Sequence, residues 1–345
     1  MTPQAASGPL DAQAVTDKVQ PGIVNIDAPA PYSQQLSEGT GMVLTASGLV
    51  LTNNHVISGA TSPTATLAAS GKTYKATILG YDSSDDVALL QLAGASGLTP
   101  VTVGNSDGVT VGQHILGLGN AQGQGGPPTA APGHVTALNQ TISPADQSTG
   151  TTETLHGTIQ TSAQIQEGDS GGPLANAAGQ VIGMDTAASQ TQSLNGSSTN
   201  AGFAIPIDKA LQVAREIAAG QGGAGNDDTT VQIGLPPFMG ISVADAAQGC
   251  ANSGFGGFGN QGFGGAPASS GALICGVYPS TPAAAAGLAQ GDTITGLNGK
   301  PVASASSLVS ITSGFRPGQA LTVKFVDGTG AARSATLTLI GGPAK

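Results

Sequence analysis

The chain has 345 residues, a length that suits two domains better than one. Its formal net charge of −10, from 20 acidic and 10 basic residues, would repel phosphates and anionic lipids, which argues against nucleic acid and membrane surfaces as partners. Because tryptophan is absent and Phe and Tyr are few, the core must consist of short aliphatic side chains, a composition that favours short strands and glycine-rich turns.

Short apolar runs separated by Gly, Asn and Pro follow one another from residue 22 to residue 206. Examples are 41–44, 75–79 and 181–184, and runs of this length and spacing predict an all-β barrel or sandwich. Residues 120–133 are rich in Gly and Pro. Because proline cannot donate a hydrogen bond to a strand ladder, we expect a surface loop there.

A helix is predicted directly after Pro206. Apolar residues recur with helical spacing from Ile207 to Ala218, and Gly220 follows the expected end of the helix. Residues 220–228 have the composition of a flexible connector. The expected divisions are a flexible segment at 1–10, a first domain at 11–219, a linker at 220–230 and a second domain at 231–345.

The second domain has the pattern of a small mixed α/β fold. Its expected elements are strands at 240–243, 273–277, 292–297, 321–326 and 334–339, with helices after Pro282 and around 306–311. The dipeptide Asn298-Gly299 sets up a tight two-residue hairpin. Cys250 and Cys275 flank a Gly/Phe-rich insert, and a disulfide between them would close a loop of about 26 residues and add roughly 3 to 4 kcal/mol. Two buried thiols are the alternative.

The most informative segment, 168–174, has the sequence Gly-Asp-Ser-Gly-Gly-Pro-Leu. Its glycines let the backbone turn sharply, so that the amides of Gly168 and Ser170 can point together at a developing oxyanion beside the Ser170 hydroxyl. A serine hydroxyl is a weak nucleophile and needs a base and an orienting carboxylate. The segment therefore predicts that both are supplied elsewhere in the chain.

Two upstream segments offer these groups. His55 follows an apolar strand, and Asp86 directly precedes the apolar run 87–90. Asp85 is the neighbouring competitor, but only Asp86 abuts that run. The order His, Asp, Ser is that of chymotrypsin. The remaining histidines have no comparable setting and are interpreted as surface or structural residues; they are His114, His134 and His156.

Taken together, these motifs resemble the HtrA/DegP family, and more closely its secreted actinobacterial branch. The matching segments are 51–56, 86–90, 119–120, 168–174 and 202–206. The resemblance begins near residue 11 and implies a mainly β protein with a chymotrypsin-like double β-barrel followed by a small α/β PDZ domain. It also implies His55 as general base, Asp86 as its orienting partner, Ser170 as nucleophile, and the amides of Gly168 and Ser170 as oxyanion hole.

Two positions depart from the family pattern. Asp169 stands where HtrA proteins usually carry Asn, and the sequence offers no Ile-Val-Gly-Gly-type amino terminus to pair with it. Ala121 replaces the usual Pro after Gly-Asn. Six residues before the nucleophile, Gln164 occupies the floor of the expected primary pocket, so cleavage after basic residues is not expected. The resemblance implies a preference for small aliphatic residues, and the other expected pocket residues are Gly202, Phe203 and Ala204.

The segment 238–241, Phe-Met-Gly-Ile, resembles the carboxylate-binding loop of PDZ domains, in which backbone amides bind the terminal carboxylate of a peptide. The segments 287–288, 291–294 and 297–300 also match bacterial PDZ domains. The expected peptide-binding residues are Phe238, Met239, Gly240, Ile241 and Leu308.

The sequence thus predicts a serine endopeptidase that hydrolyses unfolded or misfolded proteins and binds carboxyl-terminal peptides at its PDZ domain, without metal or organic cofactor. The alternative is a chaperone or peptide sensor with latent protease activity. The resemblance implies a homotrimer, with a monomer as the alternative. We expect an extracytoplasmic location, secreted or in the cell envelope, with the export signal absent from the sequence given.

Overall fold

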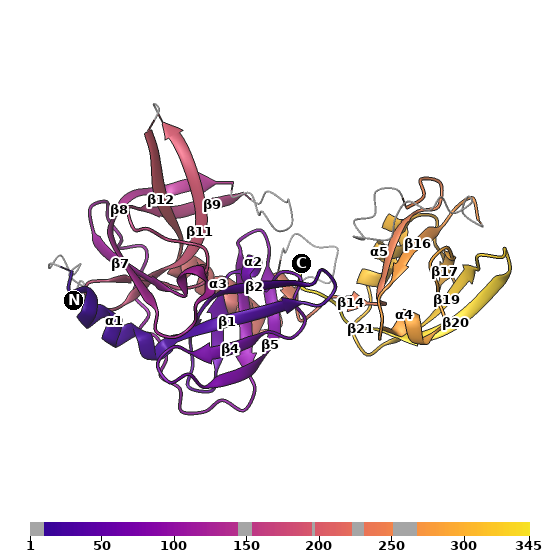
Figure 1. Ribbon diagram of the computed structural model, residues 1–345, viewed down its shortest axis with the longest axis horizontal. Helices are drawn as coiled ribbons and strands as arrows, with labels where there is room; N and C mark the ends of the chain where they lie inside the picture. Colours follow the sequence, from indigo (N-terminus) through magenta and orange to yellow (C-terminus); the bar gives the residue numbers. More distant parts are fainter. Residues whose placement is uncertain (1–9, 144–153, 195–196, 223–230, 251–267) are drawn as a thin grey trace. The chain divides into compact units, whose positions relative to one another are not determined.

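A computed structural model describes residues 10–143, 154–194, 197–222, 231–250 and 268–345 (Figure 1). The described residues form two compact units. The first contains everything up to residue 222 together with 231–234 and 344–345, and the second contains 235–343. Residues 231–234, which composition assigned to the second domain, thus belong to the first unit. The expected insert at 251–267 and most of the expected linker and amino-terminal segment lie outside the described residues.

The first unit begins with a six-stranded barrel in the order β5-β4-β1-β2-β3-β6, closed by pairing of β5 with β6 (Figure 1). Alternate residues of β5, among them Tyr74, Ala76 and Ile78, face its interior. A further strand, β13, pairs with the end of β5. The bounds are β1 Ile23–Ala30, β2 Gln35–Val43, β3 Leu49–Thr52, β4 Thr64–Leu67, β5 Thr73–Asp82, β6 Val87–Leu92 and β13 Val231–Ile233.

A second closed barrel has the order β10-β11-β12-β9-β8-β7. Its bounds are β7 His114–Gly119, β8 Thr129–Ile142, β9 Leu155–Thr161, β10 Pro173–Asn176, β11 Val181–Leu194 and β12 Ser197–Pro206. The expected loop at 120–133 is wrong in its second half, because residues 129–133 begin β8 and Pro132 pairs with Leu116. Proline is tolerated there because β8 pairs with β9 only from Val135 onward, which leaves its first residues on an edge.

Helices complete the first unit. In α1 (Ala12–Val19), Asp11 caps the first turn by accepting a hydrogen bond from the amide of Ala14 at 3.0 Å. The helix predicted after Pro206 is confirmed as α3 (Ile207–Ala218). The short helices are η1 Gln20–Gly22, α2 Asn54–Ile57 and η2 Ala121–Gly123. None of the helices in the described part of the chain has the length and apolarity needed to cross a bilayer.

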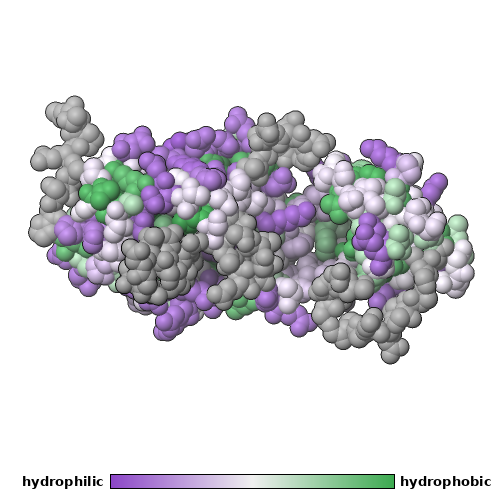
Figure 2. All heavy atoms as spheres, turned by 90° about the horizontal axis from the view of Figure 1, so that it is seen from above, coloured by the Kyte–Doolittle hydropathy of each residue, from purple (hydrophilic) through white to green (hydrophobic). Residues whose placement is uncertain are grey.

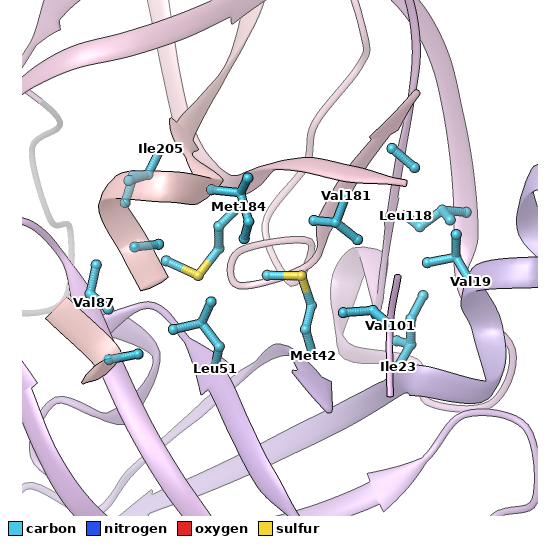
Figure 3. Packing of buried hydrophobic residues seen from close by; sticks show 14 of the residues in the cluster. Val19, Ile23, Met42, Leu51, Val87, Val101, Leu118, Val181, Met184 and Ile205 are labelled. Carbon is cyan, nitrogen blue, oxygen red and sulfur yellow. The ribbon is translucent and has the colours of Figure 1, made fainter. Parts of the chain in front are cut away.

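The two barrels share one buried hydrophobic cluster. Figure 3 shows Met42 and Leu51 of the first barrel beside Val181 and Met184 of the second, and all four side chains are fully buried. Burying such side chains supplies the main stabilising free energy of a core. The two barrels are therefore held together by one core, and the predicted mainly β double-barrel architecture is confirmed.

The second unit is a small sheet with two helices. Its strands lie in the order β15-β16-β17-β19-β20, β18 pairs with β17, and β14 pairs with β21. The bounds are β14 Pro237–Phe238, β15 Ile241–Asp245, β16 Ala272–Val277, α4 Pro282–Ala285, β17 Thr293–Leu297, β18 Lys300–Pro301, α5 Ala305–Ser313, β19 Ala320–Val326, β20 Ala332–Thr338 and β21 Ile340–Gly341. The predicted hairpin is confirmed, because Asn298 and Gly299 both have positive φ and Leu297 pairs with Lys300.

Two further features concern surface and cross-linking. Cys250 and Cys275 form a disulfide that joins the end of the β15 region to β16. On the face drawn in Figure 2, hydrophilic and hydrophobic residues are intermixed over both units. The exposed large hydrophobic residues of the described chain come from separate elements; they are Leu36, Val103, Val111, Ile233, Val309 and Ile340. Single exposed residues of this kind are normal for a protein surface.

Candidate active site

Ser170 lies in the tight turn that precedes β10, and the turn depends on its glycines. Gly168 and Gly171 have φ values of 93° and 84°, in the region that favours glycine. A β-carbon at Gly168 would collide with the carbonyl oxygen of Asn120, and one at Gly171 with that of Thr40. A β-carbon at Gly172 would likewise collide with the carbonyl oxygen of Leu118, so the sequence places glycine at three positions where the backbone leaves no room for a side chain.

Thr40 of β2, a fully buried residue that sequence reasoning missed, fixes this turn to the first barrel. Its amide donates to the carbonyl of Ser170 at 2.8 Å. Its hydroxyl donates to the carbonyl of Gly168 at 2.7 Å and accepts from the amide of Asn120 at 2.9 Å. A polar residue between two glycines in the middle of a buried strand, Gly39-Thr40-Gly41, was the signal that could have found it.

The orientation of the Glu167–Gly168 peptide decides where the Gly168 amide points. The carbonyl of Glu167 accepts a hydrogen bond from the amide of Gln122 at 2.7 Å, so it faces the η2 turn. Because this peptide is trans and planar, the Gly168 amide points to the opposite side. A carbonyl in that place would block an oxyanion hole, whereas a donor there can serve as part of one.

His55 lies on α2, directly after β3, and faces Asp86. Its Nδ1 is 2.9 Å from Oδ2 and 3.0 Å from Oδ1 of Asp86, and its backbone amide donates to Oδ1 at 3.0 Å. The Asp86 side chain is 2% exposed and that of His55 is 33% exposed. Because a carboxylate only accepts hydrogen bonds, Nδ1 carries the proton, and Nε2 is left with a lone pair that can act as a base.

Neighbouring residues hold Asp86 in place. The side chain of Asn53 donates to the carbonyl of Asp86 at 2.9 Å, and the Thr186 hydroxyl lies 3.4 Å from Asp86 Oδ2. The backbone of Asp86 itself has a positive φ of 52°, in the left-handed region, directly before β6. Asp85 points elsewhere, since its carboxylate forms an ion pair with Lys209 at 2.7 Å.

Asp169 finds its partners within its own loop. Its Oδ2 accepts from the amide of Gln166 at 2.9 Å, and its Oδ1 lies 3.5 Å from the hydroxyl of Thr129. Burial raises the pKa of Asp169 above its ordinary value, and these hydrogen bonds oppose the rise. No amino-terminal amine is needed to account for its position. The negative charge of Asp169 in turn helps to raise the pKa of Asp185, a second buried acid that sequence reasoning did not single out.

The expected pocket residues do not all lie together. Gln164 is exposed, whereas Phe203 and Ala204 of β12 are buried in hydrophobic clusters of the second barrel. Gly202 lies against Ile165, because a β-carbon at Gly202 would come within 2.7 Å of the Ile165 side chain. Ile165 is therefore a neighbour of Gly202 that the sequence did not reveal.

The remaining histidines lie at the surface. Nδ1 of His134 is 2.9 Å from the hydroxyl of Ser162, and Nδ1 of His156 is 3.1 Å from that of Thr141. His114 is exposed and pairs with His134 across β7 and β8.

In the second unit, the expected peptide-binding segment runs from β14 into β15. Met239 is buried, and the positive φ of Gly240, 88°, lets its backbone pass against Thr281. Ile241 packs in the same hydrophobic cluster as Leu308 of α5, so β15 and α5 are neighbours. The Phe238 ring lies 6.0 Å from another aromatic ring, that of Tyr278.

Comparisons with known proteins agree with both units. The profile of the trypsin-like peptidase domain matches residues 39–184, and that of the PDZ domain matches residues 237–333. Serine protease PepD of Mycobacterium tuberculosis (strain ATCC 25618 / H37Rv) is 31% identical over 98% of this chain and 68% of its own length. The periplasmic pH-dependent serine endoprotease DegQ of Escherichia coli (strain K12) is 34% identical over 85% of this chain and 56% of its own length.

A solved structure has the same overall architecture. The HtrA-type protease AlgW, solved with a tripeptide, aligns with a TM-score of 0.51 and 28% identity, and covers 96% of this chain and 97% of the other. The chain spans about half to two thirds of the length of curated relatives such as DegQ and PepD. This chain belongs to the HtrA/DegP family of serine endopeptidases, which carry a trypsin-like protease domain followed by a PDZ domain.

Proposed function

We propose that this protein hydrolyses peptide bonds of unfolded or misfolded proteins, with Ser170 as nucleophile, His55 as general base and Asp86 as its orienting partner. The observation that carries the proposal is the 2.9 Å contact between His55 Nδ1 and the buried carboxylate of Asp86. A buried carboxylate on Nδ1 fixes the tautomer whose Nε2 can accept a proton and stabilises the imidazolium that results.

The reaction then proceeds in two halves. Nε2 of His55 takes the proton of the Ser170 hydroxyl as Oγ attacks the scissile carbonyl, and the amides of Gly168 and Ser170 stabilise the oxyanion. His55 gives the proton to the leaving amine, which departs and leaves an acyl-enzyme. Water, activated by the same base, releases the acid product and restores the serine.

We further propose that the site prefers small aliphatic residues before the scissile bond. Gln164 carries no charge that would favour Arg or Lys in the substrate. The apolar side chain of Ile165 beside Gly202 supports the same preference, because an apolar wall gains free energy only by covering an apolar group.

The PDZ domain is proposed to bind carboxyl-terminal peptides of substrates or activators. The segment 238–241 would supply backbone amides for the terminal carboxylate, β15 would pair with the peptide backbone, and Ile241 and Leu308 would line the pocket for its last side chain. AlgW, the HtrA-type relative, was solved in complex with a tripeptide and with a decapeptide.

An extracytoplasmic location, secreted or in the cell envelope, is proposed for the protein. Several relatives are named periplasmic, and the disulfide between Cys250 and Cys275 fits an oxidising compartment. A homotrimer is the proposed assembly, and sedimentation analysis of the purified chain would distinguish it from a monomer.

The proposed activity is tested with a denatured protein such as casein. Wild type is expected to degrade it, and Ser170→Ala is expected to lose this activity while remaining folded. Ser70→Ala, which removes an exposed hydroxyl in the turn after β4, is the matched control and should retain full activity. Equal hydrolysis by wild type and Ser170→Ala would overturn the assignment of the nucleophile.

A further inference from the structure

Asp185 of β11 lies directly behind the nucleophile turn. Its amide donates to the carbonyl of Gly172 at 2.8 Å, and its carbonyl accepts from the amide of Gly171 at 2.8 Å. The residue is fully buried. Its backbone is thus part of the scaffold that holds the residues next to Ser170, while its side chain has no role in the proposed catalytic steps.

The Asp185 carboxyl group lies in a buried and largely apolar place. Within the part of the chain that the structure describes, neither of its oxygens has a hydrogen-bond partner. A charged carboxylate is strongly disfavoured in such a place, since burial removes its solvation. Burial, and secondly the negative charge of Asp169, raise the pKa of Asp185 well above its ordinary value, and the backbone of Leu118 opposes this rise only in part.

Two glycines of β7 bring the two acids together. Alternate residues of a strand face the same side, so Gly117 and Gly119 share one face of β7. A β-carbon at Gly117 would come within 3.1 Å of Asp185 Oδ2, and one at Gly119 within 2.6 Å of Asp169 Oδ1. The carboxyl group of Asp169, and that of Asp185 together with the Ile165 side chain, therefore lie over one face of β7, in the space that these two glycines leave open.

Other groups around Asp185 do not titrate. The packed elements contribute Gly117 and Leu118 from β7, Ala204 from β12 and Gly172 from the turn. Two other titratable groups adjoin these residues: Glu167 precedes Gly168, and Oδ2 of Asp86 lies 3.4 Å from the hydroxyl of Thr186, the residue after Asp185. Glu167 is exposed, and Asp86 is engaged by His55 and Thr186. Asp169 is the charged neighbour that raises the pKa of Asp185.

We propose that Asp185 retains a proton at neutral pH and forms an acid–carboxylate pair with Asp169, and that this pair positions the 166–170 loop with the Gly168 amide toward the substrate. A protonated Asp185 has one O–H donor. The acceptor is Oδ1 of Asp169, which lies over the same face of β7 and has a long contact of 3.5 Å with the hydroxyl of Thr129. Loss of the proton would place two negative charges in one buried site. Because Asp169 adjoins Ser170, their repulsion would displace the oxyanion loop.

This inference makes Asp185 a positioning residue and rests on the proposed function of Ser170. It predicts a pH effect on the transition state rather than on substrate binding. As pH rises and Asp185 ionises, kcat should fall while KM stays nearly constant, because the Gly168 amide serves only the oxyanion.

Infrared spectroscopy of the full chain tests the protonation directly. Wild type at neutral pH should show the absorption of a protonated carboxyl group, and Asp185→Asn should lose it. Asp292→Asn, which alters a buried acid of the second unit that accepts from the amide of Ala289, is the matched control and should keep the absorption. The absence of this absorption in wild type, or its persistence in Asp185→Asn, would overturn the proposal.

A second variant links protonation to activity. Asp169→Asn removes the neighbouring charge and introduces the residue that HtrA proteins usually carry there. The midpoint at which the Asp185 absorption disappears should then move to lower pH by about one unit, as expected from a nearby unit charge at intermediate dielectric. In wild type, kcat should decline with the same midpoint as the absorption, and an unchanged midpoint in Asp169→Asn would refute the pairing.

These readouts separate the two proposals. The infrared absorption does not require catalysis, so it would survive in Ser170→Ala whether or not that variant is active. Full hydrolysis by Ser170→Ala would remove the nucleophile assignment and leave the acid pair standing. If wild type lacks the absorption but Ser170→Ala is inactive, the acid pair is overturned and the nucleophile assignment stands.

Discussion

Replacement of Thr40 by valine would test how the first barrel holds the nucleophile turn. Valine keeps the shape of threonine but removes the hydroxyl that donates to Gly168 and accepts from Asn120. Two buried groups would lose their partner at a site that is 0% exposed, and each such loss costs about 1 to 3 kcal/mol. We therefore expect the free energy of unfolding to fall by about 2 to 6 kcal/mol.

The same substitution should impair catalysis, because the Gly168 carbonyl would no longer be tethered and its amide would lose its fixed direction. Complete loss of one oxyanion donor typically lowers kcat by about 10² to 10³. Because Thr40→Val would loosen this donor without removing it, we expect a smaller decrease in kcat, of at least about tenfold. Urea unfolding and peptide hydrolysis measure the two effects. Thr66→Val, which removes a hydroxyl that contacts only Thr73 in the described chain, is the control. Wild-type stability and kcat in Thr40→Val would refute this reasoning.

The other predictions concern charge, pH and the disulfide. Asp86→Asn should lower kcat by about 10³- to 10⁴-fold with an unchanged fold, because His55 loses the acceptor that fixes its tautomer; near-normal kcat would contradict this role. Because the pKa of Asp185 is raised in the native state, the stability that it contributes is greatest below the unfolded pKa and falls as pH rises toward the native one. In urea unfolding, the free energy of unfolding of wild type should therefore fall by up to about 1.4 kcal/mol per pH unit relative to that of Asp185→Asn over that interval. Parallel curves of unfolding free energy against pH for the two proteins would contradict a raised pKa of Asp185. Reduction of the Cys250–Cys275 disulfide should destabilise the second unit by about 3 kcal/mol, with the unfolding of the first unit unaffected in calorimetry.

Local patterns carried much of the information in this sequence. Segment 168–174 combined glycines with a serine in an order that only a sharp turn accommodates, and the structure shows why side chains are excluded at Gly168 and Gly171. The hairpin at Asn298-Gly299 was predictable for the same reason, since two successive positive φ values require such residues. Where one residue's conformation is nearly dictated by its chemistry, sequence reasoning succeeded.

Features that depend on distant partners were not predictable. The edge position of Pro132 in β8 depends on where β9 ends its pairing, and the addition of β13 to β5 joins residues about 150 positions apart. Thr40 and Asp185 gave weak signals, because a lone polar residue in an apolar run does not reveal which buried groups surround it. Their significance appears only once the two barrels and the nucleophile turn are assembled.

The most direct test of the central assignment is to react the native protein with a fluorophosphonate and to locate the adduct by mass spectrometry. We predict a single, stoichiometric adduct on Ser170, formed far more slowly in Asp86→Asn because His55 no longer activates the hydroxyl. Labelling at another serine, or equal rates in wild type and Asp86→Asn, would contradict the proposed roles of Ser170, His55 and Asp86.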